Sequence, residues 1–187
     1  MLSLLEGVRG NDAMNGPQLR ILLFIKSLSQ GGAERQCCVL ARQLAEAGHS
    51  VCVVVYDMAD SFYAGLMPKE IPVVSLKRSR WNVPGLLFGL RRQIKVFKPD
   101  IVYSFMSHSN LLSVAIRGFS NTKTVCGIRS SALDLSSEST LSRFGEYLHR
   151  KALYLADLVI ANSHAAKLEI IETGLKKKKI IVLANGI

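Results

Sequence analysis

Apolar residues in this chain alternate between short continuous runs and longer segments with helical spacing. Residues 21–25 form an uninterrupted apolar run with the length of a parallel strand buried on both faces. The next segment carries one helical stripe of apolar residues, at Ala33, Cys37, Leu40, Ala41 and Leu44. Gly48 is placed to end that helix, and a second strand is expected at 51–56. The start of the chain therefore predicts a strand–helix–strand unit.

The same alternation continues to the end of the chain. Further strands are expected at 72–76, 101–105, 124–128, 158–161 and 180–183, and helices at 84–97, 108–118, 140–156 and from 163 to about 173. Ser107 and Ser163 are placed to cap the helices that follow them. Inward-facing stripes are expected at Leu87, Leu90, Ile94 and Phe97, and at Leu141, Phe144, Leu148, Ala152 and Leu155. The pattern predicts a Rossmann-like, doubly wound α/β fold, with a mostly parallel sheet of about seven strands and helices on both faces.

The length of 187 residues fits one domain, expected over residues 20–187. Residues 1–19 are polar and contain glycine, so we expect a disordered leader rather than a signal peptide. Apolar runs stay well below the roughly 18 residues of a membrane span. These features favour a cytoplasmic protein.

Four cysteines bear on redox and metal chemistry. Cys37, Cys52 and Cys126 fall on expected core positions, and Cys38 is next to one of them. Their spacing is not that of a C-x-x-C metal site, and no histidine pair accompanies them. The sequence therefore predicts buried, reduced thiols and no metal site.

The net charge of +10 is unevenly distributed. Between residues 70 and 100 lie seven basic residues and no acid: Lys77, Arg78, Arg80, Arg91, Arg92, Lys95 and Lys98. Such a patch attracts phosphates, anionic lipid or nucleic acid. The apolar stripe of helix 84–97 fits burial in the core, but Trp81 with Arg78, Arg80, Arg91 and Arg92 could instead contact lipid headgroups. Nucleic-acid motifs are absent from the sequence, so a nucleic-acid partner is not expected.

In an open parallel sheet, ligands bind beyond the carboxyl ends of the strands. Gly31 and Gly32 follow the first strand there, and free amides at a helix start can hold an oxyanion. A simple tight turn explains the pair equally well. The pattern is not G-x-G-x-x-G, and Asp57 is the one acid near the usual ribose-binding position, so a nicotinamide dehydrogenase is poorly supported.

Other polar residues follow later strands. Arg129 could clamp a phosphate or carboxylate, or pair on the surface with a nearby acid such as Asp134. His108 could act as a base or simply begin a helix. Asn162 and Ser163 first of all begin a helix, with ligand contact as the second interpretation. No catalytic residue can be assigned from these patterns.

Four segments in order resemble the retaining glycosyltransferases of family four, which have the GT-B fold. Residues 31–35 read GGAER and are followed by the family's L-x-x-x-G-H-x-V pattern at 44–51. Residues 98–102 read KPDIV, and residues 156–163 read ADLVIANS. The end of the chain, KIIVLANGI at 179–187, resembles the hinge between the two domains of such enzymes.

The resemblance implies the N-terminal, acceptor-side half of a two-domain enzyme. Such an enzyme moves a sugar from a nucleotide-diphosphate sugar to a glycan or lipid-linked acceptor, as in polysaccharide biosynthesis, without metal or cofactor. It implies that Gly31 and Gly32 contact the donor phosphate or sugar and that Arg129 contacts phosphate or acceptor, with His108, Asn162 and Ser163 as further cleft residues. The resemblance also implies that the protein is attached peripherally to the inner face of the membrane.

The sequence departs from the family pattern in two ways. It ends at the hinge, so we expect the donor domain to be missing and the chain to be inactive alone. Arg129 stands where many members have a histidine. Two alternatives therefore stay open: a non-catalytic acceptor-binding or partner module of the same fold, and a protein similar to a nucleotide-sugar epimerase.

Overall fold

The described residues of the computed structural model are 17–57, 62–77, 82–119, 121–128, 140–172, 174–176 and 179–183. They contain a seven-stranded sheet in the order β3-β2-β1-β4-β5-β6-β7, and every neighbouring pair is parallel. The predicted fold class is thus confirmed. The strands are β1 (Arg20–Ile25), β2 (Ser50–Val55), β3 (Val73–Ser75), β4 (Ile101–Phe105), β5 (Lys123–Ile128), β6 (Leu158–Ala161) and β7 (Ile180–Val182).

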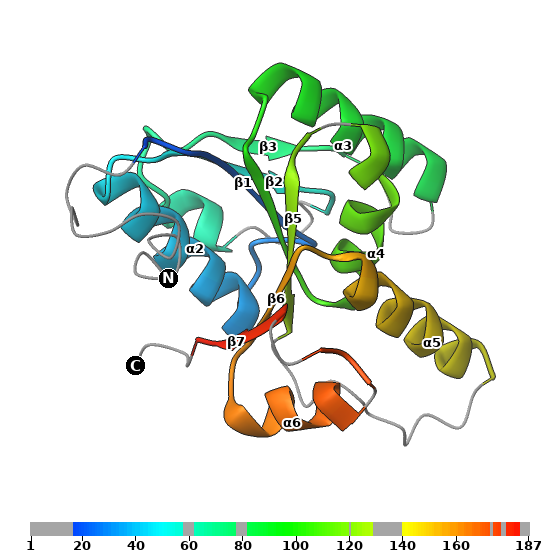
Figure 1. Ribbon diagram of the computed structural model, residues 1–187. Helices are drawn as coiled ribbons and strands as arrows, with labels where there is room; N and C mark the ends of the chain where they lie inside the picture. The colour runs from blue at the N-terminus through cyan, green and yellow to red at the C-terminus, as the bar shows by residue number, and fades with distance from the viewer. Residues whose placement is uncertain are drawn as a thin grey trace.

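Helices cover both faces of this sheet (Figure 1). Over the first strands, α2 lies on one face while α3 and α4 lie on the other, and α5 and α6 pack over β5 to β7. The helices are α2 (Gly32–Glu46), α3 (Val83–Phe97), α4 (Ser107–Ala115), α5 (Thr140–Leu155) and α6 (His164–Glu172), with short 3-10 helices η2 (Phe62–Leu66) and η3 (Arg117–Phe119). This is the layered arrangement that a doubly wound sheet requires.

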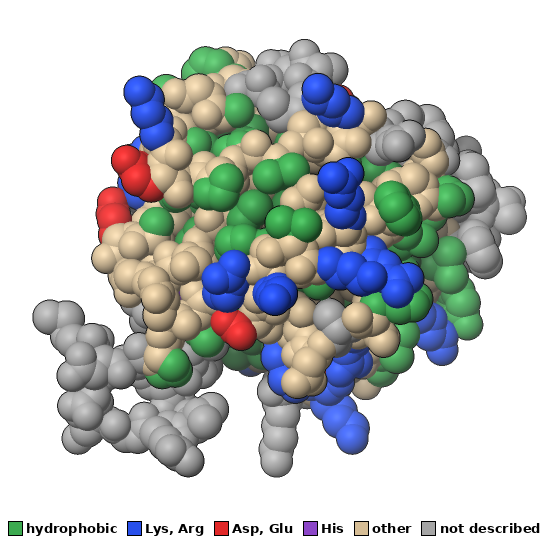
Figure 2. Space-filling view, turned by 90° about the horizontal axis from the view of Figure 1, so that it is seen from above, with side chains coloured by type: hydrophobic (Ala, Val, Ile, Leu, Met, Phe, Trp, Pro, Cys, Tyr) green, Lys and Arg blue, Asp and Glu red, His purple; other side chains and the backbone are tan. Residues whose placement is uncertain are grey.

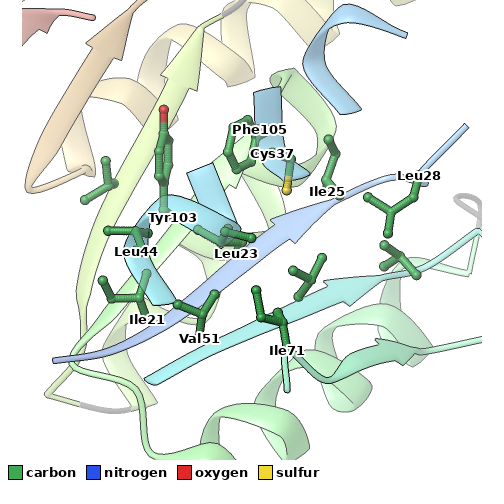
Figure 3. Packing of buried hydrophobic residues seen from close by; sticks show 14 of the residues in the cluster. Ile21, Leu23, Ile25, Leu28, Cys37, Leu44, Val51, Ile71, Tyr103 and Phe105 are labelled. Atoms are coloured by element: carbon green, nitrogen blue, oxygen red, sulfur yellow. The ribbon is translucent and has the colours of Figure 1, made fainter. Parts of the chain in front are cut away.

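The central strand β1 is buried on both sides, which explains its continuous apolar run. Ile21, Leu23 and Ile25 face α2 and lie near Tyr103 and Phe105 of β4 (Figure 3). The alternate residues of β1 belong to the core beneath α3 and α4. A strand with two buried faces cannot show the polar alternation of a half-exposed strand.

Most helix ends follow the sequence signals. Gly48 has a φ of +85° just beyond α2, a conformation suited to glycine. Asn82 caps α3 by accepting a hydrogen bond from the Gly85 amide at 3.0 Å. Ser163 caps α6 as predicted, since its hydroxyl accepts from the Ala166 amide at 3.1 Å. The prediction for Ser107 is wrong, because Ser107 is the first residue of α4 and Met106 precedes it without a side-chain cap.

The predicted inward stripe of α5 is confirmed at Ala152 but wrong at Leu148 and Leu155. Leu148 and Leu155 are 38% and 56% exposed, whereas His149, Ala152, Leu153 and Ala156 are buried. Small side chains and one histidine face the core because α5 packs closely against α4. In α3, Leu90 and Ile94 are buried as predicted, and Leu86 rather than Leu87 is the third buried residue. The side chains of Leu141 and Phe144 lie outside the described part of the structure.

Two aspartates in the segments that resemble the family form hydrogen bonds with backbone amides at the amino-terminal edge of the sheet. Asp100, before β4, accepts a hydrogen bond from the Arg20 amide at 2.8 Å. Asp157, before β6, accepts from the Thr124 amide at 2.9 Å and from the Arg117 guanidinium at 2.8 Å. Both carboxylates satisfy donors at strand starts, so their roles in the fold are structural.

A buried polar network joins α4 and α5 to the middle of the sheet. The Ser104 hydroxyl donates to the Asn110 side-chain oxygen at 2.7 Å, and the Asn110 amide nitrogen donates to the Gly127 carbonyl at 3.1 Å. The same nitrogen lies 3.2 Å from Nε2 of His149. Burial lowers the pKa of His149 to about 4, because the charged ring would lose its hydration.

The cysteines behave as predicted. Cys37, Cys52 and Cys126 are buried, Cys38 is half-buried, and all four thiols are free. Burial raises the pKa of Cys52 to about 11 and that of Cys126 to about 12. Both thiols therefore stay protonated near neutral pH.

His149 gives the fold a defined pH dependence. Its pKa is lowered to about 4 in the folded chain, against about 6.5 in the unfolded chain. Between these two pKa values the unfolded chain binds a proton at His149 and the folded chain does not. The contribution of neutral His149 to stability is therefore complete above about pH 6.5 and is lost as the pH falls toward 4. Between pH 7 and pH 5 the loss is about 2 kcal/mol.

Urea unfolding of the wild type and of His149→Gln at both pH values measures this effect, because glutamine keeps a hydrogen-bonding group but does not titrate. The control is His164→Gln, since His164 is exposed at the start of α6. The variant H149Q should lose about 2 kcal/mol less than the wild type between the two pH values. An equal loss in both proteins would contradict the buried, neutral state of His149.

Candidate functional site

The candidate site lies at the carboxyl-terminal edge of the sheet, where the strand order reverses. From β1 the chain builds outward to β2 and β3, and β4 then starts the other half on the opposite side of β1. The segments after β1 and β4 lead into α2 and α4, which lie on opposite faces of the sheet. Such a divergence opens a crevice in which doubly wound folds bind ligands.

The glycine pair lies at this edge of the sheet, at the start of α2. Gly31 precedes α2 with a φ of −166°, an extended conformation open to any residue. A Cβ at Gly31 would overlap the carboxylate of Glu34, so glycine here leaves room for that side chain. Gly32 is exposed, and a Cβ there would meet no atom within 4 Å. The backbone at Gly32 is therefore open to a ligand.

Glu34 lies in the same segment as the glycine pair, and no role was assigned to it from the sequence. It is an acid in the first turn of α2, and its carboxylate lies beside Gly31. A negative charge there interacts favourably with the helix dipole. An anion that approaches the first amides of α2 meets this carboxylate, whereas a sugar hydroxyl can donate a hydrogen bond to it. The acid three residues after Gly31 was the available signal.

Met106 supplies a strained backbone at the start of α4, on the other face of the sheet from α2. Its φ of 70° and ψ of 161° form a conformation that side chains other than glycine rarely adopt. The Met106 amide donates to the Gly127 carbonyl at 3.2 Å, and its own carbonyl accepts from the Asn110 amide at 2.9 Å. Such strain costs about 1–3 kcal/mol and concentrates at functional sites. A methionine gives no sequence signal for this geometry.

His108 lies in the first turn of α4, close to the end of β2. Its ring centroid is 5.5 Å from that of Tyr56, and the side chain is half-buried. Asn110, two residues further on, belongs to the buried network described above. His108 therefore lies at the same edge of the sheet as Gly31 and Gly32, after the strand next to β1.

Asn162 and Ser163 lie further along the same edge, after β6. Two strand spacings separate β6 from β4, a distance of about 10 Å. Both residues are half-buried, and the Ser163 hydroxyl is used as the helix cap. They extend the edge rather than line the crevice between α2 and α4.

Several predicted residues lie outside the described part of the structure. These are Arg129, the hinge residues 184–187, residues 1–16 of the leader, and Arg78, Arg80 and Trp81 of the basic patch. Arg91 and Arg92, the remaining members of the patch, are exposed on α3. Leu19, the last residue of the expected leader, is in the described part of the chain, and its carbonyl accepts a hydrogen bond from the Ser50 amide at 2.9 Å.

Among the described residues, no three His, Cys, Asp or Glu side chains are grouped so that they could hold a metal ion. A search of the same residues for a helix long and apolar enough to cross a bilayer finds none.

Solved structures with similar folds come from several nucleotide-sugar proteins. HepE of Anabaena, determined with UDP, has a TM-score of 0.72 at 20% identity, over 90% of this chain and 44% of that chain. A UDP-GlcNAc 2-epimerase from Methanocaldococcus jannaschii has a TM-score of 0.65 at 15% identity, over 88% of this chain and 45% of its own. A glycosyltransferase from Rickettsia africae has a TM-score of 0.63 at 18% identity, over 92% of this chain and 44% of its own.

A curated relative adds a sequence match. It is the Campylobacter jejuni enzyme GalNAc-α-(1→4)-GalNAc-α-(1→3)-diNAcBac-PP-undecaprenol α-1,4-N-acetyl-D-galactosaminyltransferase, 29% identical over 107 residues. The match covers 53% of this chain but 29% of the relative, so the chain spans under half the length of the proteins it resembles. The model of Glycosyltransferase Family 4 matches residues 30–187. This match covers most of the chain and includes the glycine pair, so the chain belongs to glycosyltransferase family 4.

Proposed function

We propose that this chain is the acceptor-side domain of a glycosyltransferase. The enzyme would move a sugar from a nucleotide-diphosphate sugar to a glycan or lipid-linked acceptor. The observation that carries the proposal is the family match over residues 30–187, which contains the whole candidate crevice. The chain covers about 44% of the HepE chain, so the proposal assigns the donor chiefly to a second domain outside these residues.

The glycine pair is assigned to the donor side of this reaction. Negative charge grows on the leaving phosphate as the glycosidic bond breaks, and amides at a helix start stabilise such charge. The open backbone at Gly32 supports a close approach by phosphate or sugar. Glu34 lies beside Gly31. It would turn away from an incoming phosphate or accept a hydrogen bond from a sugar hydroxyl.

The remaining site residues are assigned by their positions along the edge. Arg129 follows β5 directly, and β5 neighbours the strand that leads to Met106 and His108. A guanidinium in that position suits a phosphate or the acceptor. His108 is assigned to the crevice, and Asn162 and Ser163 to its outer end. The nucleotide sugar is a substrate in this proposal, and the reaction needs no cofactor.

A lipid-linked acceptor is the finer part of the proposal. The Campylobacter relative is named for a substrate linked to undecaprenol diphosphate. On this chain, Arg91 and Arg92 are exposed on α3, and Phe88 on the same helix is 70% exposed. Basic and aromatic side chains together suit an anionic bilayer surface. We therefore place the protein in the cytoplasm, peripherally at the inner face of the membrane. The epimerase alternative rests on similarity of fold alone.

Replacement of Gly32 by valine tests the donor assignment. The change puts a branched side chain where the backbone is open, so the fold should tolerate it while a ligand should not. The control is Gly118→Val, because Gly118 in η3 is equally open but lies at the opposite edge of the sheet. In the protein translated from the complete reading frame, G32V should lower kcat/KM for release of nucleoside diphosphate at least about tenfold, as expected for the loss of one ligand contact.

The control G118V should stay within about twofold of the wild type, and both variants should unfold at the wild-type temperature. Unchanged turnover in G32V would remove the glycine pair from the donor site.

Charge reversal on α3 tests the membrane assignment. Arg91→Glu together with Arg92→Glu should weaken binding to vesicles that contain phosphatidylglycerol by about tenfold or more, since each basic residue near such a surface contributes about 1 kcal/mol. Lys69→Glu with Lys176→Glu gives the same change in net charge, with both residues exposed away from α3. Co-sedimentation with vesicles measures both. Equal losses in the two double variants would show that total charge rather than α3 drives binding.

A further inference from the structure

A cavity of about 340 Å³ opens at the amino-terminal edge of the sheet. The last turns of α3 and the segments around η3 line it, before β4 and β5 begin. Its volume lies in the range of small-ligand sites, roughly 300–1,000 Å³. It is separated from the candidate crevice by the length of β4, five residues or roughly 17 Å. This cavity is therefore distinct from the proposed donor and acceptor sites.

Three cations form one wall of the cavity. Arg91, Lys95 and Lys98 all line it, and all are exposed. Their spacing of four and three residues places them along one side of α3 and its end. Figure 2 looks onto this end of the molecule, where Lys and Arg side chains lie among hydrophobic ones. The wall thus concentrates positive charge beside apolar surface.

Among the described residues, no carboxylate forms an ion pair with these three cations. Asp100 is the acid among the lining residues, and its carboxylate accepts a hydrogen bond from the Arg20 amide. Within the described ranges, the ion pairs that form join Asp157 to Arg117 and Lys123, not to the three cations of the cavity. Lysines near the end of a helix also interact with its dipole. The helix dipole therefore accounts for the positions of Lys95 and Lys98. It does not account for Arg91, which lies more than one turn before the end of α3.

Arg91 lies over an aromatic ring that also lines the cavity. Its guanidinium carbon lies 4.2 Å from the ring centroid of Phe119, a residue of η3 that is 58% exposed. Stacking uses the face of the guanidinium and leaves its in-plane N–H donors available for a phosphate. A guanidinium that is already oriented loses less freedom when it binds. The stack therefore prepares Arg91 for paired hydrogen bonds to an oxyanion.

Neutral groups complete the cavity on the side of β5. Asn121 is exposed and lines the cavity with its neighbour Thr122, whose hydroxyl donates to the Pro99 carbonyl at 3.0 Å. Buried Ile94 and Ile116 form part of the lining beneath them. A ligand here meets cations on one wall, an amide on the other and apolar side chains below.

We propose that this cavity binds a phosphate-bearing ligand, held by Arg91, Lys95 and Lys98 with Asn121 beside them. The proposal does not depend on the glycosyltransferase assignment, because it uses the opposite edge of the sheet. The phosphate could belong to a soluble diphosphate or to a lipid headgroup, and the two sources share the same recognition chemistry. Two arms of one experiment separate them.

The matched pair of variants is Arg91→Glu and Arg92→Glu. The two residues are adjacent and exposed on α3 and change the net charge equally, but Arg91 alone of the two lines the cavity. In the first arm, inorganic pyrophosphate is titrated into the full chain by calorimetry. In the second arm, vesicles of phosphatidylcholine with phosphatidic acid are used. Lys95→Gln is a milder second variant that keeps the Arg91 stack intact.

With pyrophosphate, a phosphate site predicts that R91E weakens binding at least about tenfold while R92E stays within about twofold, because only Arg91 contacts the ligand. On vesicles both variants lose the general attraction of a basic residue to the surface, and R91E should weaken binding about tenfold more than R92E does, because it also removes the direct contact. The arm in which the difference appears identifies the source as soluble or lipid. Lys95→Gln should weaken the same arm by a smaller factor. Equal effects of R91E and R92E in both arms, or no binding of either probe, would overturn the cavity proposal. If R91E and R92E weaken vesicle binding equally, α3 is attracted to membranes by its overall charge and the cavity is not a lipid headgroup site.

Discussion

Burial of the central strand on both faces is the constraint on which the rest of the structure depends. Alternate residues of β1 face α2 on one side and α3 with α4 on the other, so neither face tolerates a polar side chain. Parallel strands cannot be joined by tight turns, so each needs a helical crossover. These crossovers bring the segments after every strand to a single edge. The glycine pair, Met106 and His108 all lie at this edge because of strand order, although up to 77 residues separate them in sequence.

Most of the fold could be predicted from the sequence because its strands are continuous runs of apolar, mainly branched residues and its helices carry clear end signals. The rotation of α5 could not. Tyr147, Leu148, Tyr154 and Leu155 are all apolar yet exposed, and the helix instead turns His149 inward to Asn110. Periodicity cannot detect a hydrogen bond across 39 residues. The strained backbone of Met106 and the position of the Glu34 carboxylate likewise depend on tertiary contacts.

The polar residues at the two edges of the sheet have different roles. At the amino-terminal edge, Asp100 and Asp157 accept hydrogen bonds from backbone donors at strand starts, so these two acids of the family-like segments are structural. The carboxyl-terminal edge keeps an open glycine backbone beside a carboxylate, which suits a phosphate and sugar hydroxyls. The family match contains the glycine pair, and we propose this edge as the place of glycosyl transfer. The basic cavity gives the opposite edge a proposed second role.

The most direct measurement of the central claim follows a labelled sugar. The protein from the complete reading frame is incubated with nucleotide sugars labelled in the sugar and with polyprenyl-diphosphate glycans, and the products are separated into lipid and aqueous fractions. Our account predicts that label enters the lipid fraction with release of an equal amount of nucleoside diphosphate. Label that stays on the nucleotide as an epimerised sugar, or donor that is not consumed with any acceptor, would contradict it.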